Sequence, residues 1–110
     1  KAISVGERSE LSGHNIQIDR ANTGVVSKDD SDAKLDKVTF KGIVGSPLMT
    51  YIKKAEYGPA RLACNNCSLE ESLIANQYGS SIKVDNRSVA AVNFSTRQMT
   101  CMLRLMDPFL

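Results

Sequence analysis

Side chains that could bind a ligand are most closely spaced in the segment 52–59. Its donors are the ammonium groups of Lys53 and Lys54. Its acceptor is the carboxylate of Glu56, and Tyr57 adds a flat amphipathic ring. Convergent polar groups of this kind orient a ligand, and both signs of charge beside one ring suit a carboxylated or hydroxylated polymer. We therefore predict a ligand-binding surface here; a structural loop with a packed Tyr57 is the alternative explanation.

The cysteines and the single histidine offer a second set of reactive side chains. Cys64 and Cys67 have the spacing of a metal site, but a structural zinc ion needs four ligands. The second closely spaced pair of ligands is missing, because Cys101 and the single His14 are isolated in the sequence, so we predict no metal site and no cofactor. We interpret Cys67 as a small apolar residue of the interior. An odd number of cysteines favours a reducing compartment or the absence of a structural disulfide.

A repeat in the amino-acid sequence indicates the fold that would position these candidate side chains. Residues 3–19 match residues 25–41 at an offset of 22, without a gap. The coinciding apolar pairs are Ile3 with Val25, Leu11 with Ala33, Ile16 with Val38, and Ile18 with Phe40. Such a period, with short alternating apolar pairs, indicates an all-β solenoid in which each coil stacks on the next. A β-sandwich with chance similarity between two hairpins is the alternative that we consider weaker.

The same spacing extends further along the chain. Leu62, Cys67 and Leu69 restore it after the segment 51–59, which we interpret as an insertion. We predict one domain, 1–110, of three to four coils, with a short strand at 90–94 and no helix. The predicted coils are 2–22, 23–43, 44–71 and 72–89, followed by an irregular C-terminal segment, 90–110.

Three segments resemble bacterial proteins with a parallel β-helix. They are KAISVGE at 1–7, GVVSKD at 24–29 and YIKKAEYGPA at 51–60. The likeness covers about residues 1–90 and is to repeat proteins of NosD-like or pectate-lyase-like type, some of which accompany CotH-like domains in surface proteins. The resemblance implies a right-handed parallel β-helix and a place at the bacterial cell surface or envelope.

The insertion leaves the coil after the second repeat, so its base should lie beside the turn of that repeat. This argument adds Lys28 and Asp29 to the predicted ligand-binding surface. The full prediction for ligand-binding residues is Lys53, Lys54, Glu56, Tyr57, Lys28 and Asp29.

The resemblance also raises a catalytic alternative. β-Helix polysaccharide lyases combine bound calcium with an Arg or Lys base, and the acidic residues of 29–32 lie one coil from Glu7. Arg8 and Lys28 are close to these acids in sequence. However, the ligand spacing of a calcium loop is not met, and a solvated turn of alternating charges explains the run. We therefore predict no catalytic residue.

Composition narrows the class of partner. A net charge of +2 is too small to indicate nucleic-acid binding. No apolar run approaches the length of a membrane span. The chain begins flush with a strand at Ala2, so we expect the remainder of a longer polypeptide, or self-association of coil ends, to cover the first coil.

Two functions are compatible with these residues. The first is a non-catalytic β-helix module that acts as a scaffold or binds polysaccharide. The second is a fragment of a carbohydrate-active enzyme, a lyase or an epimerase. The fold permits both, but the chain lacks a convincing set of calcium ligands with a base. This absence favours the non-catalytic module.

Overall fold

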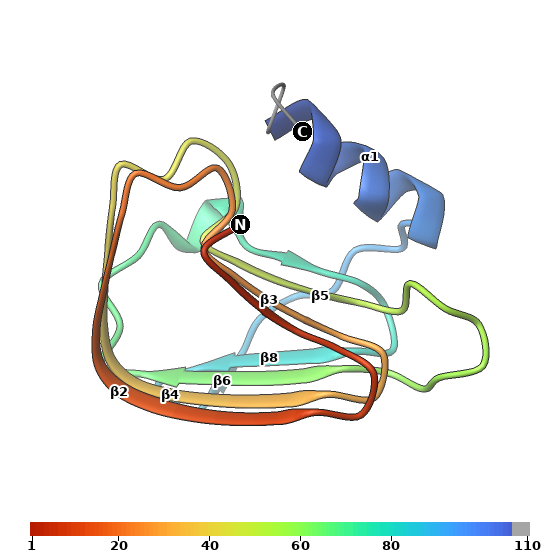
Figure 1. The fold of residues 1–110 in the computed structure, drawn as a ribbon, viewed down its shortest axis with the longest axis horizontal. Helices are drawn as coiled ribbons and strands as arrows, with labels where there is room; N and C mark the ends of the chain where they lie inside the picture. Colours follow the sequence, from red (N-terminus) through yellow and green to blue (C-terminus); the bar gives the residue numbers. More distant parts are fainter. Residues whose placement is uncertain (107–110) are drawn as a thin grey trace.

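The described chain, residues 1–106 with side chains as far as Cys101, winds through about four turns in a computed structural model (Figure 1). The strands of the first sheet, in spatial order, are β1 (Ile3–Val5), β3 (Val25–Lys28), β5 (Leu48–Tyr51) and β7 (Ala75–Asn76). The strands of the second are β2 (Glu10–Asp19), β4 (Asp32–Lys41), β6 (Arg61–Asn65), β8 (Ser81–Val84) and β9 (Arg87–Ser88). Successive coils pair in parallel, which confirms the predicted all-β solenoid with a period of about 22.

The strand register follows the sequence repeat. The predicted pairs that lie in register are Ile3 with Val25, Leu11 with Ala33, Ile16 with Val38, and Ile18 with Phe40. The third coil continues the second of these columns, because Ala33 is in register with Leu62. Cys67 and Leu69 are partly buried and pack against the same core. Complete burial of a Val or Leu side chain stabilises the fold by roughly 1.5–3 kcal/mol, so these columns hold the coils together.

A bend divides each of the long strands into two arms. Asn15 in β2 and Lys37 in β4 adopt left-handed backbone conformations, with φ of 54° and 56°. The bend shifts the alternation of inward side chains by one residue, so Leu35 and Val38 both point into the core although they are three positions apart. Asn66, with φ of 55°, makes the same bend in the third coil.

The prediction that the chain lacks a structural disulfide is wrong, because Cys64 is bonded to Cys67. The bend at Asn66 turns both sulfur atoms toward the interior and leaves the two Cα atoms 5.9 Å apart, within the range that a disulfide requires. Cys67 still occupies the core-facing place that was predicted for it. Cys101 is free and exposed.

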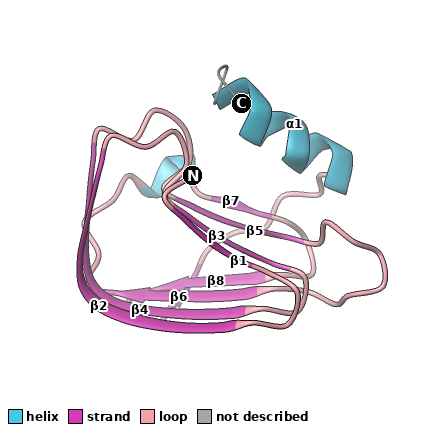
Figure 2. Cartoon of the chain, in the orientation of Figure 1, coloured by secondary structure: helices cyan, strands magenta, loops and turns pink. Residues whose placement is uncertain are grey.

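The C-terminal segment also differs from its prediction. The helix α1 (Thr96–Met106) replaces the irregular chain expected there, and the segment 90–94 forms a single bridge at Val92 instead of a strand (Figure 2). A short 3₁₀ helix, η1 (Glu71–Leu73), precedes β7. Met99 of α1 is fully buried and packs in one cluster with Val26, Met49 and other residues of the first sheet. The outward face of that sheet is apolar and needs a cover, which α1 provides.

Candidate functional site

The insertion projects from one corner of the solenoid, where it joins β5 to β6 (Figure 1). Beneath it are the turns of the first two coils, where paired left-handed residues reverse the chain. These are Glu7 and Arg8 in the first coil, and Asp29 and Asp30 in the second. We call this region the corner surface; it consists of Glu7, Arg8, Lys28, Asp29, Asp30 and 52–59.

Asp29 fixes the start of the insertion from below. Its side chain is only 1% exposed. Its Oδ1 atom accepts hydrogen bonds from the backbone N–H groups of Lys53, at 2.7 Å, and Lys54, at 2.9 Å. Its Oδ2 atom has no hydrogen-bond partner among the described residues. Asp29 therefore belongs to the predicted site as the support of the loop, and its carboxylate does not reach the surface.

Further contacts hold the base of the loop. The backbone N–H of Ile52 donates to Oε1 of Gln77 at 2.8 Å, and the carbonyl of Ile52 accepts a hydrogen bond from the hydroxyl of Thr96 at the start of α1. The carbonyl of Gly58 accepts from the N–H of Asp30 at 3.0 Å. Because the loop is anchored at both ends, its side chains are presented from an ordered backbone.

Two predicted binding residues already have partners within the corner surface. The ammonium group of Lys54 pairs with the carboxylate of Glu7, and both groups are about half exposed. This hydrogen bond and the charge of Lys54 hold the pKa of Glu7 below its usual range. The guanidinium of Arg8 lies 5.2 Å from the centre of the Tyr57 ring, a cation–π arrangement that covers one face of the ring. Arg8 also pairs with Asp30 at 3.5 Å.

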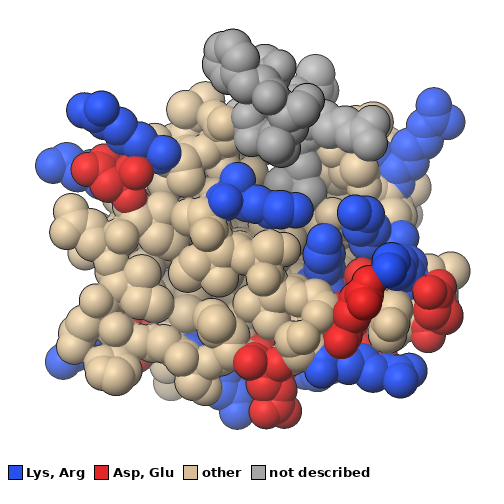
Figure 3. Space-filling view, viewed as in Figure 1, with Lys and Arg blue, Asp and Glu red and all other residues tan. Residues whose placement is uncertain are grey.

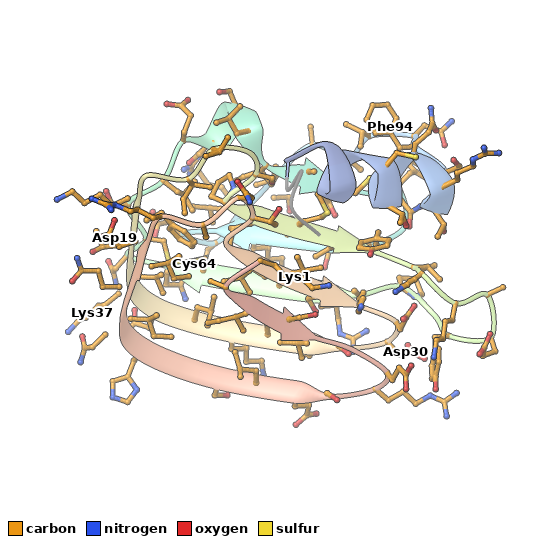
Figure 4. All side chains as sticks on the ribbon, turned by 45° about the horizontal axis from the view of Figure 1, so that its top comes forward. Lys1, Asp19, Asp30, Lys37, Cys64 and Phe94 are labelled. Atoms are coloured by element: carbon orange, nitrogen blue, oxygen red, sulfur yellow. A yellow bond between two sulfur atoms is a disulfide. The ribbon has the colours of Figure 1, made fainter. Side chains whose placement is uncertain are left out.

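Lys28 adds a partly buried positive charge to the corner surface. Burial lowers the pKa of Lys28, and the positive charges of Lys1 and Lys53 lower it further. Asp29 and Glu7 act on Lys28 in the opposite direction without cancelling the shift. Lysine and arginine side chains gather beside acidic ones around the corner (Figure 3), and Figure 4 shows Asp30 at this corner, with Lys1 apart from it at the start of the chain. A bound anion would relieve the repulsion among these ammonium groups.

The structure thus brings most of the predicted residues together at one corner. Glu56 and Lys53 are exposed on the insertion. Sequence reasoning left Glu7, Arg8 and Asp30 out of the predicted binding residues. The offset of 22 that aligns Arg8 with Asp30 was a usable signal for this pair.

Two acidic residues near the corner are engaged with arginines. Asp30 pairs with Arg8, and Asp32 lies 3.7 Å from Arg61. Within residues 1–106, no group of three or more His, Cys, Asp or Glu side chains is placed to hold a metal ion.

Comparison with protein-family models, with curated proteins and with solved structures gave no match to this chain. The fold class consequently stands on the coil geometry alone. None of the helices in the described part of the chain has the length and apolar character needed to cross a lipid bilayer.

Proposed function

We propose that this chain is a non-catalytic β-solenoid module that binds an anionic polysaccharide at the corner surface and otherwise serves as a rigid scaffold. Following the resemblance of residues 1–90 to NosD-like and pectate-lyase-like repeat proteins, we place it in a bacterial surface or envelope protein. The observation that carries the binding function is the anchored insertion: Asp29 fixes the backbone of Lys53 and Lys54, whose side chains are exposed at the same corner as Lys28.

Lysines on two neighbouring coils suit a polymer better than a single small anion. Neighbouring strands of a sheet lie about 4.8 Å apart, and Lys28 lies opposite Tyr51, two residues before Lys53. A linear polyanion that crosses this corner can place successive negative groups near Lys28 and Lys53. Backbone hydrogen bonds to Asp29 hold Lys53 in place before binding, which reduces the entropy that binding would cost.

Calorimetric titration with polygalacturonate tests this proposal. Replacing Lys53 and Lys54 together by Ala should weaken binding by roughly tenfold or more, since each charge near a surface contributes on the order of 1 kcal/mol. Lys53→Ala alone should cost more than Lys54→Ala, because Glu7 already pairs with Lys54. The melting temperature should stay within about two degrees of that of the parent chain, since exposed charges add little stability.

A matched control variant removes the same charge elsewhere. Lys34 and Lys83 are exposed on β4 and β8, in the second sheet, and their replacement by Ala should leave the affinity within about twofold. Neutral dextran should not bind the parent chain. Equal losses in the control and in the loop variant would show that net charge alone drives binding, and unchanged binding in the loop variant would remove the corner surface from consideration.

A further inference from the structure

A shallow groove crosses the bends of the first three coils. It lies on the opposite side of the molecule from the corner surface, as the positions of Lys37 and Asp30 in Figure 4 show. Its volume is about 340 Å³, within the roughly 300–1,000 Å³ that is usual for small-molecule sites. The groove runs across the strands on the lateral face of the solenoid, so a further coil stacked on the first would lengthen it without covering it.

Two rows of exposed polar side chains form the walls of this groove. The first row consists of the left-handed residues at the three bends, which are Asn15, Lys37 and Asn66. The second row lies two positions further along each coil and consists of Gln17, Thr39 and Ser68, which pair in register. Because neighbouring strands lie about 4.8 Å apart, each row repeats a hydrogen-bonding side chain at about this interval along the groove.

Several contacts fix the part of the groove that the third coil supplies. The Nδ2 atom of Asn66 donates a hydrogen bond to Oδ1 of Asp36 at 3.0 Å, and the backbone N–H of Asn66 donates to Oδ1 of Asp85 at 2.7 Å. Cys67, which lies between Asn66 and Ser68, is tied to the core by its disulfide. These residues are therefore ordered before a ligand arrives, which lowers the entropy that binding would cost.

Lys37 departs from the residue type that the other two bends use. The backbone φ is 54° at Asn15, 56° at Lys37 and 55° at Asn66. Asn is enriched in this left-handed region, whereas a lysine is less favourable there. No ion pair among the described residues engages the ammonium group of Lys37. Because such departures from local preference are expected at functional sites, we assign this ammonium group to a ligand.

We propose that the groove binds a short saccharide chain, with Lys37 paired to the carboxylate of an acidic sugar and the two rows hydrogen-bonded to sugar hydroxyl groups. Hydroxyl groups both donate and accept, as the amides and hydroxyls of the walls do. An extended peptide fits less well, because the backbone groups along the groove already pair between coils. A single lysine supplies too little positive charge for a nucleic-acid strand. This inference goes beyond the proposed function, because the groove shares no residue with the corner surface.

Amide chemical shifts of the 110-residue chain, measured by NMR during titration with trigalacturonate, test the location of binding. The amides of Gln17, Thr39 and Ser68 should shift together and saturate, independently of the amides of Lys53 and Lys54. Shifts confined to the corner surface would reject the groove and leave the proposed function standing. Shifts confined to the groove would reject the corner surface and support this inference, and no shift at either place would reject both.

Lys37→Asn should change affinity and stability in opposite directions. The affinity measured from the groove amides should fall roughly tenfold, the loss expected for one hydrogen bond to a charged group. The melting temperature should rise, because asparagine tolerates the left-handed bend better than lysine. Lys34→Asn removes the same charge from an exposed position earlier in β4 and should leave the groove affinity within about twofold.

The outcomes of this pair of variants are distinct. A higher melting temperature with unchanged groove affinity would identify Lys37 as an ordinary solvated lysine and overturn the proposal. Equal losses in Lys37→Asn and Lys34→Asn would show that net charge alone attracts the probe. Thr39→Val tests the second row without a change of charge, because valine keeps the β-branched shape and removes only the hydroxyl. It should weaken groove binding roughly threefold, and an unchanged affinity would exclude this row from the site.

Discussion

Asp29 lies beneath the backbone of Lys53, and its Oδ1 atom accepts the N–H of that residue at 2.7 Å. One buried carboxylate of the second coil thus sets the conformation of a loop inserted in the third. The two residues are 24 positions apart in sequence. This relationship makes the loop part of the solenoid's corner and explains why its exposed lysines can act together with Lys28.

Two substitutions of Asp29 test its hydrogen bonds to the loop and its left-handed backbone conformation. Asp29→Ala removes the acceptor and places alanine at φ of 55°, which costs roughly 1–2 kcal/mol for the backbone alone. Two lost acceptor contacts add about 1–3 kcal/mol. Asp29→Asn keeps an oxygen acceptor and tolerates this conformation, so it should be much milder.

Hydrogen exchange provides the readout for this pair of variants. In Asp29→Ala, the amides of Lys53 and Lys54 should exchange faster than in Asp29→Asn. Core amides such as that of Val38 should keep the same order of exchange rates in both variants. Equal protection of the loop amides in both variants would mean that Asp29 does not anchor the insertion.

Val38→Asp tests the stacked core. Val38 is 1% exposed and lies in register with Ile16, so the new carboxylate would be buried without a partner. That costs several kcal/mol, comparable with the whole stability of a small domain. The variant should be unfolded by circular dichroism at room temperature. Thr39→Asp, one residue away but exposed, should remain folded; unfolding of both variants would contradict the assigned facing of β4.

The disulfide should contribute modestly to stability. It closes a loop between residues three positions apart, for which the chain-entropy model gives about 2 kcal/mol. Replacing both Cys64 and Cys67 by Ala, or adding reductant, should lower the urea concentration at the unfolding midpoint. The decrease should correspond to this free energy. Cys101→Ser changes an exposed free thiol and should leave the midpoint where it was. Insensitivity of the parent chain to reductant would argue against the bond.

Polyanion binding should depend on pH through Lys28. Burial and the charges of Lys1 and Lys53 lower the pKa of this side chain, so it loses its proton at a lower pH than an ordinary lysine, whose pKa is about 10.4. A bound anion favours the charged form and raises the pKa again, which means that binding takes up protons. Affinity should therefore fall as pH rises through the lowered pKa of Lys28.

Lys28→Arg separates this effect from general charge loss, because arginine stays protonated throughout the range. Its affinity should remain flat until the other lysines titrate. Titrations at constant salt, in buffers of different ionisation enthalpy, measure the proton uptake directly. An identical pH profile for the parent chain and Lys28→Arg would show that Lys28 does not face the ligand.

The coil and its register could be predicted from the amino-acid sequence. Parallel strands of a solenoid pair at a fixed offset, so the match of Ile16 with Val38 in sequence became their pairing in space. The location of the insertion and its nearness to Lys28 followed from the same offset. These features depend on the sequence repeat of about 22 residues, which can be read from a single amino-acid sequence.

The remaining features depend on how the coils stack and could not be predicted in the same way. The Cys64–Cys67 bond requires a left-handed bend at Asn66 that reverses the inward alternation, and spacing alone does not reveal that bend. Helix α1 forms over an apolar sheet face, so its place depends on residues far away in sequence, such as Met49. The burial of Asp29 beneath Lys53 likewise arises from stacking, because a charged turn residue becomes a buried anchor only when the next coil covers it.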